Sequence, residues 1–406
     1  MISTTLDAEP ACPGIDETSA PSGPALTART RRLIATRQPF DSVPAQVWDA
    51  LAACNRWSTP FARWAFHRSW WEAYGASAHD QTVVVHDAAS PGEPPVAIVP
   101  LMHRHQVEPT DSEIRTTMRH AEGAHLTPVE PSAKAIFFGA SYHADYATIL
   151  GHRADLPAVA EALVDLLAHE AGDDEQPPKP WDEVDLRRLR CGDPAADALE
   201  KAFDRRAATD AWTVIRERED VCPVVDLPRG ADFTAYLATL GKKERHEIRR
   251  KIRRAEAVGE VRLTVSKTPL VDLEAFIELH QKRWGADGLF PPTPGGDCSR
   301  RFFRHLFRHF GPDGPAKLTF LTVGDRRVAT GVHFDDGEVL YYYNAGVDPD
   351  ARELSPGVLM VARYMEMALA LGRRRVDFLR GNEPYKYEWG AVDEPIQRVL
   401  VERASA

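Results

Sequence analysis

The stretch VDFLRGNEPYKYEWGA, residues 376–391, gathers acidic, basic and phenolic side chains just after a short apolar run. Lys386 can bring a positive charge to a carbonyl oxygen or a phosphate. Tyr385 can donate to an oxyanion or protonate a leaving group, and Glu383 or Asp377 can accept a proton from an amine. These residue types favour acyl transfer to an amine, which needs a neutral amine, a stabilised oxyanion and a protonated leaving group.

Other side chains of the same segment and of the strand before it complete this predicted site. Arg380 suits an anionic donor or acceptor, and Tyr387 is an alternative proton donor. Tyr343, in the apolar run EVLYYYNAGV, is a predicted substrate contact. We expect Trp389 to pack in the core.

The sequence SPGVLM at residues 355–360 predicts the start of a helix, with Ser355 as N-cap and Pro356 at the first helical position. A helix N-terminus presents unpaired backbone N–H groups and the positive end of the helix dipole, so it can bind an anion. Gly357 allows close approach to the backbone of Val358. A plain capped helix is the alternative interpretation.

A second predicted anion-binding element is the basic helix at 241–256, GKKERHEIRRKIRRAE. Arg245 and Arg249 fall on one stripe at helical spacing. A phosphate-binding face for a nucleotide, a coenzyme or tRNA and a solvated face above buried isoleucines both fit this pattern. Arg283 and Trp284 end the next predicted helix and are predicted substrate contacts.

No metal site is expected. His103, His105, His120 and His125 match no standard zinc spacing, and the five cysteines contain no Cys-x-x-Cys pair. The cysteines also argue against a disulfide framework and fit a reducing cytoplasm. No P-loop, GxGxxG or GxSxG motif is present.

The predicted elements are strands, a helix and a strand in the first half, and helices, a three-stranded meander, a helix and a strand in the second. Gly324-Asp325 and Asp336-Gly337 lie at the two turns of the meander, and Asp-Gly between alternating apolar runs is a strong hairpin signal. The order predicts an α/β (α+β) fold with mixed sheets. We expect a disordered leader at 1–43, an N-terminal domain at 44–225 and a C-terminal domain at 226–406.

Composition sets limits on function. The 406 residues carry a formal net charge of −10 and are 43% hydrophobic, which is ordinary for a protein of two or three domains. An acidic chain has no global attraction for DNA or membranes. No apolar run is long enough for a membrane span.

Five segments together resemble a bacterial acetyltransferase family, the BioF-like or CelD-type branch of the GNAT superfamily, related to the FemAB aminoacyltransferases. They are LGKKERHEIRRKIRRAEAVG, LHQKRWG, RRVATGVHF, YYYNAGVDPDARELSPGVLM and VDFLRGNEPYKYEWGA. The resemblance covers about residues 45 to 403. It implies two tandem GNAT-like domains, each with a mixed, mainly antiparallel sheet flanked by helices.

The resemblance also implies a function. An acyl-CoA would thread between splayed strands, with its pyrophosphate at Ser355 to Val358, and transfer an acyl group to an amine of a small molecule, sugar or peptide. ELSPGVLM departs from the GNAT signature, which puts CoA in doubt. FemAB-like relatives use aminoacyl-tRNA, and the lysine of a Tyr-Lys motif, matched by Tyr385 and Lys386, lies at their transfer site. A non-catalytic GNAT pair is a third hypothesis.

Overall fold

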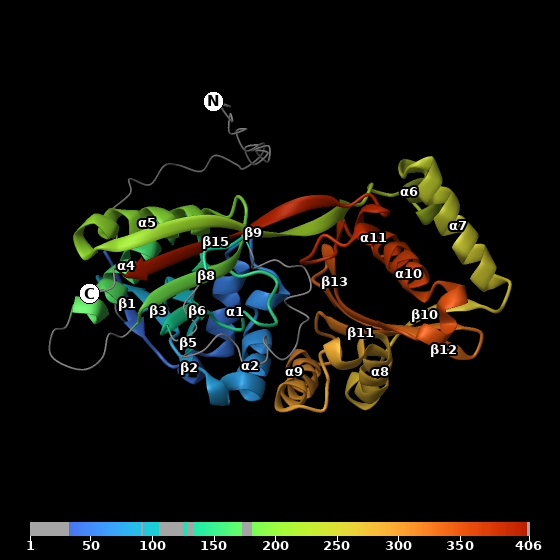
Figure 1. Ribbon diagram of the computed structural model, residues 1–406. Helices are drawn as coiled ribbons and strands as arrows, with labels where there is room; N and C mark the ends of the chain where they lie inside the picture. Colours follow the sequence, from blue (N-terminus) through green and yellow to red (C-terminus); the bar gives the residue numbers. More distant parts are fainter. Residues whose placement is uncertain (1–31, 91, 105–124, 129–132, 173–180, 404–406) are drawn as a thin grey trace, which may run out of the picture.

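The computed structural model describes residues 32–90, 92–104, 125–128, 133–172 and 181–403 (Figure 1). No helix within these ranges has both the length and the apolar character needed to cross a membrane. The α-helices are α1 (Ala45–Ala53), α2 (Trp64–Tyr74), α4 (Leu156–Gly172), α5 (Pro194–Asp210), α6 (Phe233–Thr239), α7 (Lys242–Glu256), α8 (Pro269–Trp284), α9 (Pro294–Phe310), α10 (Pro356–Ala370) and α11 (Pro384–Tyr387).

The described strands form two sheets. One has the order β1 (Leu33–Arg37), β3 (Val83–Asp87), β4 (Ala97–Val99), β7 (Leu150–Gly151). The other, eleven-stranded, has the order β10 (Val261–Val265), β11 (Ala316–Val323), β12 (Arg326–Asp335), β13 (Val339–Val347), β14 (Arg375–Asp377), β9 (Trp212–Asp226), β15 (Val392–Arg403), β8 (Glu183–Arg190), β6 (Ala135–Phe138), β5 (Leu101–Arg104), β2 (His79–Asp80). Only β6–β8 and β13–β14 pair in parallel among these strands, so the prediction of mixed, mainly antiparallel sheets is confirmed.

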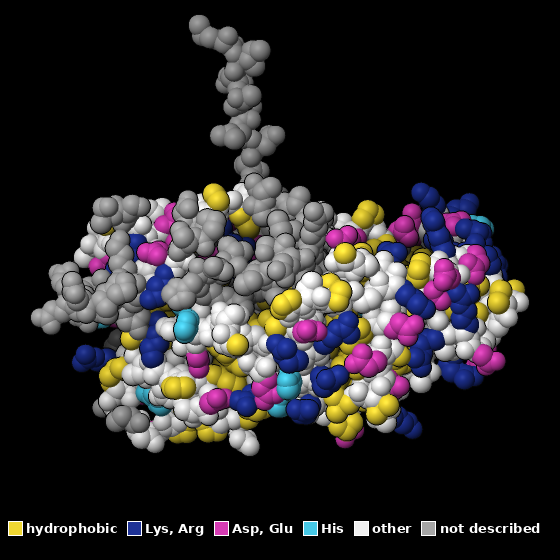
Figure 2. All heavy atoms as spheres, turned by 60° about the horizontal axis from the view of Figure 1, so that its bottom comes forward, with side chains coloured by type: hydrophobic (Ala, Val, Ile, Leu, Met, Phe, Trp, Pro, Cys, Tyr) yellow, Lys and Arg dark blue, Asp and Glu magenta, His cyan; other side chains and the backbone are white. Residues whose placement is uncertain are grey.

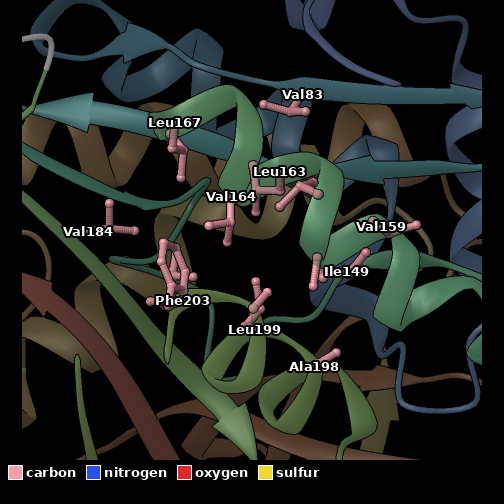
Figure 3. Close-up of a cluster of buried hydrophobic side chains, with 14 of the residues drawn as sticks. Val83, Ile149, Val159, Leu163, Val164, Leu167, Val184, Ala198, Leu199 and Phe203 are labelled. Atoms are coloured by element: carbon pink, nitrogen blue, oxygen red, sulfur yellow. The ribbon is translucent and has the colours of Figure 1, made fainter. Parts of the chain in front are cut away.

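The N-terminal half packs α4 and α5 against its strands around an apolar cluster. Figure 3 shows Leu163 and Val164 of α4 and Phe203 of α5 facing the same interior. These side chains are fully buried, as is Val184 of β8. The helical spacing of apolar residues over 155–172 predicted α4. α5 was not predicted, because its buried face consists mainly of alanines and so shows no strong apolar stripe.

The prediction of a disordered leader at 1–43 is wrong from Leu33 onward, because these residues form a strand and a short helix. β1 pairs antiparallel with β3, and the buried ring of Phe40 lies 5.1 Å from that of Trp48. The isolated strand LIATR lacks a clear apolar alternation, so only its pairing with β3 reveals it. Residues 1–31 lie outside the described residues, as do His105 and His120.

The apolar run at 95–105 is broken at Pro100, which separates β4 in one sheet from β5 in the other. Proline has no N–H to donate to a ladder, so the chain changes sheets there. The predicted hairpin between this run and residues 81–87 is confirmed by the antiparallel pairing of β3 with β4.

The two halves share β9 and β15, which run side by side from one half to the other (Figure 1). β15 also pairs with β8, so β15 belongs to the N-terminal part of the sheet. Arg398 of β15 and Asp185 of β8 form a fully buried ion pair, with Nε 2.6 Å from Oδ1. A domain boundary at residues 225 and 226 stays a proposal. Residues 392–403, however, pair with β8 and so do not belong, as predicted, to the C-terminal domain alone.

The C-terminal half has helices on both faces of the β11–β13 meander. α8 and α9 cover one face, while α6, α7 and α10 lie on the other (Figure 1). Both predicted tight turns of the meander are present, with Gly324 and Gly337 at positive φ angles of 58° and 95°. α9 begins at Pro294, within the predicted loop at 289–299, because Thr293 accepts a hydrogen bond from the Gly296 N–H and caps the helix.

The sequence predicted no disulfide framework, but one of the described cysteines is disulfide-bonded. Cys54, Cys222 and Cys298 are free, whereas Cys191 is disulfide-bonded. The cytoplasmic location stays a prediction.

Candidate active site

A cavity of about 900 Å³ opens where β13 and β14 separate. The parallel pairing ends at Tyr341 and Asp377; β13 continues to Val347, but β14 stops. The cavity is lined by the second part of β13, the end of α8, the start of α10 and the segment after β14. The two neighbouring strands thus diverge within one sheet, and the cavity lies in the wedge-shaped space between them.

The start of α10 closes one end of this cavity, where Ser355, Gly357 and Val358 line the wall. Ser355 occupies the N-cap position but makes no capping hydrogen bond with its side chain. Its backbone is left-handed, with φ 56°, and its hydroxyl accepts a hydrogen bond from Arg254 of α7 at 2.7 Å. Ser355 thus stands at the predicted N-cap position and Pro356 at the predicted first helical position, but the side chain of Ser355 does not cap the helix.

The segment after β14 forms another wall of the cavity, and the side chain of Lys386 holds the backbone of this segment in place. Lys386 is 2% exposed, and its Nζ donates to the carbonyl oxygens of Leu379, Arg380 and Gly381 at 3.0, 2.7 and 2.8 Å. Glu383 Oε2 lies 2.8 Å from the same nitrogen. An ammonium group has three N–H donors, so these partners saturate Lys386, and its predicted contact with a substrate oxygen requires a rearrangement.

The backbone that Lys386 holds is strained. Leu379 has a φ of 57°, which is rare for a residue with a branched side chain. Its N–H donates to Asp377 Oδ1 at 2.8 Å. Such a conformation persists only where surrounding contacts impose it. Lys386 and Asp377 together turn the chain sharply out of β14 and into the cavity wall.

Tyr385 and Glu383 line the cavity beside Lys386. Burial, together with Tyr342 and Glu383, raises the pKa of Tyr385 well above its usual value. Burial also raises the pKa of Tyr343. These phenols therefore stay protonated at neutral pH and can act as hydrogen-bond donors. Tyr387 lies outside the cavity lining and donates to Asp393 at 2.7 Å.

The N-terminal half contributes a part of the wall that the sequence did not predict. Asp145 forms an ion pair with Arg380, and both side chains are largely buried. His143 Nε2 lies 2.8 Å from the Tyr74 hydroxyl, and its Nδ1 lies 3.2 Å from the Tyr343 hydroxyl. Burial and the charge of Arg380 lower the pKa of His143 to about 3, so this imidazole is neutral. HADYATIL carries these residues, but only the fold brings them to β13.

The predicted arginine contacts divide into two groups. Arg283 and Trp284 line the cavity, and Trp284 Nε1 donates to the Ala345 carbonyl at 3.3 Å. Arg245 and Arg249 of α7 lie outside the lining. Lys and Arg side chains gather at the end of the molecule where α7 lies (Figure 2).

Asp377 is separated from the cavity lining and borders a second cavity of about 660 Å³. It is 1% exposed and accepts hydrogen bonds from the Tyr146 hydroxyl and the Leu379 N–H. Burial raises the pKa of Asp377 to about 6. As a general base, Asp377 would have to act from the far side of the segment that Lys386 holds. In the cavity, Glu383 and not Asp377 lies beside Tyr385.

The raised pKa of Asp377 predicts a pH effect on stability. The pKa of Asp377 is near 4 in the unfolded chain and about 6 in the folded protein, so between these values the native state binds more protons than the unfolded state. Asp377 therefore stabilises the native state fully below about pH 4, and this contribution is lost as the pH rises through 6. Asp377→Asn, which does not ionise, should gain roughly 2–3 kcal/mol relative to wild type between pH 4 and 7. Urea unfolding across this range measures the difference, with the exposed Asp325→Asn as control. A pH-independent difference would contradict the assignment.

Residues 242–387 match the family model of the acetyltransferase (GNAT) domain. The structure is similar to the crystal structure of FemX, with a TM-score of 0.55 at 12% identity, over 87% of this chain and 96% of FemX. A conserved protein of unknown function from Bacteroides thetaiotaomicron gives 0.50 at 11% identity, over 89% and 98%. No curated protein sequence matches the chain.

Proposed function

We propose that this protein, whose residues 242–387 form a GNAT acetyltransferase domain, is an N-acyltransferase that transfers an acyl group from acyl-CoA to an amine. The observation that carries the proposal is the cavity between the diverging β13 and β14, with the start of α10 at one end and the segment of Tyr385 at the other. An elongated thioester can lie in this wedge with its acyl group beside Tyr385.

The cavity fits the two ends of such a donor. At the α10 end, the Gly357 N–H and Arg352 provide donors and positive charge for a pyrophosphate. Arg283 adds a positive charge to the cavity wall near Tyr342 and Tyr385. At the other end, aromatic side chains and Leu379 offer an apolar surface for the acyl chain. The described cavity lining contains no cysteine, which favours direct attack of the amine over an enzyme-bound thioester.

The reaction assigns a role to each group beside the acyl carbon. The amine attacks the thioester carbonyl, and Glu383 accepts the proton that the amine loses. The protonated phenol of Tyr385 donates to the oxyanion or to the departing thiolate. Lys386 positions both residues through its contacts with the 379–381 carbonyls and with Glu383.

A substitution at Gly357 tests the donor. A Cβ at Gly357 meets nothing within 4 Å, so Gly357→Val leaves the fold intact but fills space over the helix N-terminus. We expect acetyl-CoA to raise the melting temperature of the wild type, and the variant to bind at least tenfold more weakly. Gly92→Val, also in open space but outside the cavity lining, is the control. No shift with millimolar acetyl-CoA would reject the acyl-CoA hypothesis.

A second candidate is an aminoacyl-tRNA-dependent transferase, because α7 places its basic side chains beside the α10 end of the cavity. Arg254 contacts Ser355, and Glu256 pairs with Arg363 of α10. Under this hypothesis tRNA binds with an affinity that falls steeply with salt, and replacing Arg245 and Arg249 weakens it. If the protein binds neither acetyl-CoA nor tRNA, the third hypothesis, a non-catalytic GNAT pair, is favoured.

A further inference from the structure

The helices α2 and α9 bring three metal-ligand side chains together outside the cavity described above. They are Glu72 of α2 and His305 and His309 of α9. The two histidines stand four residues apart, so they project from the same face of α9. Figure 2 brings this side of the molecule forward and shows histidine and acidic side chains close together near its lower centre.

The donor atoms of these side chains face one another. Glu72 Oε2 lies 2.6 Å from His305 Nδ1 and 2.9 Å from His309 Nε2. One ligand atom from each residue lies within 4.8 Å of the other two. Ligand atoms bound to one tetrahedral zinc ion at about 2.0–2.1 Å are separated by roughly 3.3 Å, so small rotations of the side chains suffice to admit an ion.

A second layer of contacts holds the ligands in place. Arg68, one turn before Glu72 on α2, donates from Nε to Glu72 Oε1 at 2.7 Å, which leaves Oε2 directed at the two imidazoles. The Trp64 ring lies edge-on to His309, with centroids 5.8 Å apart. Such contacts fix the orientation of carboxylate and imidazole ligands in metal sites.

We propose that Glu72, His305 and His309 form a binding site for a divalent transition metal, with Zn²⁺ as the ion best matched to its ligands. Two imidazoles and one carboxylate are a typical zinc ligand set. The three side chains remain 17–23% exposed, so water can reach the ion and complete its coordination. The nearby positive charge of Arg68 reduces the affinity and favours a site of moderate strength.

The position of this site indicates a structural role. α2 belongs to the N-terminal half and α9 to the C-terminal half, so a bound ion links the two. The same pair of helices holds the Tyr74 hydroxyl 3.0 Å from Ser299 Oγ, and Tyr74 contacts His143 of the cavity wall. The three ligands do not line the cavity, so we assign the ion to stability and not to acyl transfer.

Zinc titration of the tag-free full-length protein tests the site. After treatment with EDTA, we expect isothermal titration calorimetry to detect one equivalent of Zn²⁺ with a micromolar Kd. The double variant His305→Gln, His309→Gln should weaken this binding at least thirtyfold, because glutamine is a poor zinc ligand. His246→Gln, at an exposed histidine on α7, is the matched control and should bind like the wild type.

Two further measurements keep the result decisive. Zinc should raise the melting temperature of the wild type by several degrees and leave that of the double variant unchanged. Co²⁺ in place of Zn²⁺ should give the visible absorption of a low-symmetry nitrogen and oxygen site. Absence of a one-equivalent site in the wild type, or equal affinity in the double variant, would overturn the proposal and leave a hydrogen-bonded carboxylate between two imidazoles.

Discussion

Replacing Asp185 with alanine is expected to lower the free energy of unfolding by about 3–5 kcal/mol, because it leaves a buried guanidinium group without its main partner. Arg398 donates to Asp185 through Nε and Nη2, at 2.6 and 3.1 Å, and both side chains are fully buried. After the substitution, Arg398 retains only Glu217 and the Thr127 carbonyl. Urea denaturation followed by circular dichroism measures the loss.

A surface ion pair provides the control for this experiment. Glu260 and Arg262 are both more than 60% exposed, and Glu260→Ala should cost less than about 1 kcal/mol. We also expect hydrogen exchange in Asp185→Ala to accelerate along β15, because Arg398 anchors that strand to β8. A loss no larger than that of Glu260→Ala would show that β15 is held by its backbone pairing and apolar side chains alone.

Replacing Lys386 with methionine should reduce kcat/KM for acyl transfer at least a hundredfold. Methionine is of similar length but leaves the carbonyls of residues 379 to 381 buried without their donor, and each unsatisfied group costs about 1–3 kcal/mol. The strained turn at Leu379 then relaxes, and Tyr385 and Glu383 lose their positions. The measurements are steady-state transfer with the donor identified by the binding experiment and an amine panel, and the free energy of unfolding.

Tyr387→Phe is the matched control within the same one-turn helix. Its hydroxyl points to Asp393 and lies outside the cavity lining, so we expect activity within about twofold of the wild type. The split between kcat and KM separates two roles of Lys386. A positioning role lowers kcat and destabilises the protein together, whereas a direct contact with the donor raises KM while stability is kept. Unchanged activity in Lys386→Met would remove this segment from the mechanism.

The candidate site was predictable where its residues lie close together in the chain. Tyr385, Glu383 and Lys386 follow β14 directly, and Ser355 to Val358 start a helix with local signals in Pro356 and the preceding turn. Asp377 shows the limit of this reasoning. Its place in a strand was visible in the sequence, but the side of the sheet that it faces depends on the pairing of β14 with β9 and β13.

The proposed metal site shows a different limit. The histidines of HLFRH, His305 and His309, have a spacing that suits one helix face, and this signal could have been found in the sequence. Glu72 could not, because 237 residues separate it from His309 and only the packing of α2 on α9 brings them together. A search for zinc motifs misses a site assembled from two helices.

By itself, the sequence determined the elements whose signals are local: the meander with its two tight turns, the basic helix α7, and the helix start at Pro356. It also carried the segments between residues 242 and 387 that match the family model of the GNAT acetyltransferase domain. Only the tertiary structure decided that β15 returns to the N-terminal half, that Asp145 and His143 form part of the cavity wall, and that Lys386 is saturated by backbone carbonyls. These features depend on contacts between distant segments, and the free energy of such contacts comes from burial and pairing that no short stretch of sequence contains.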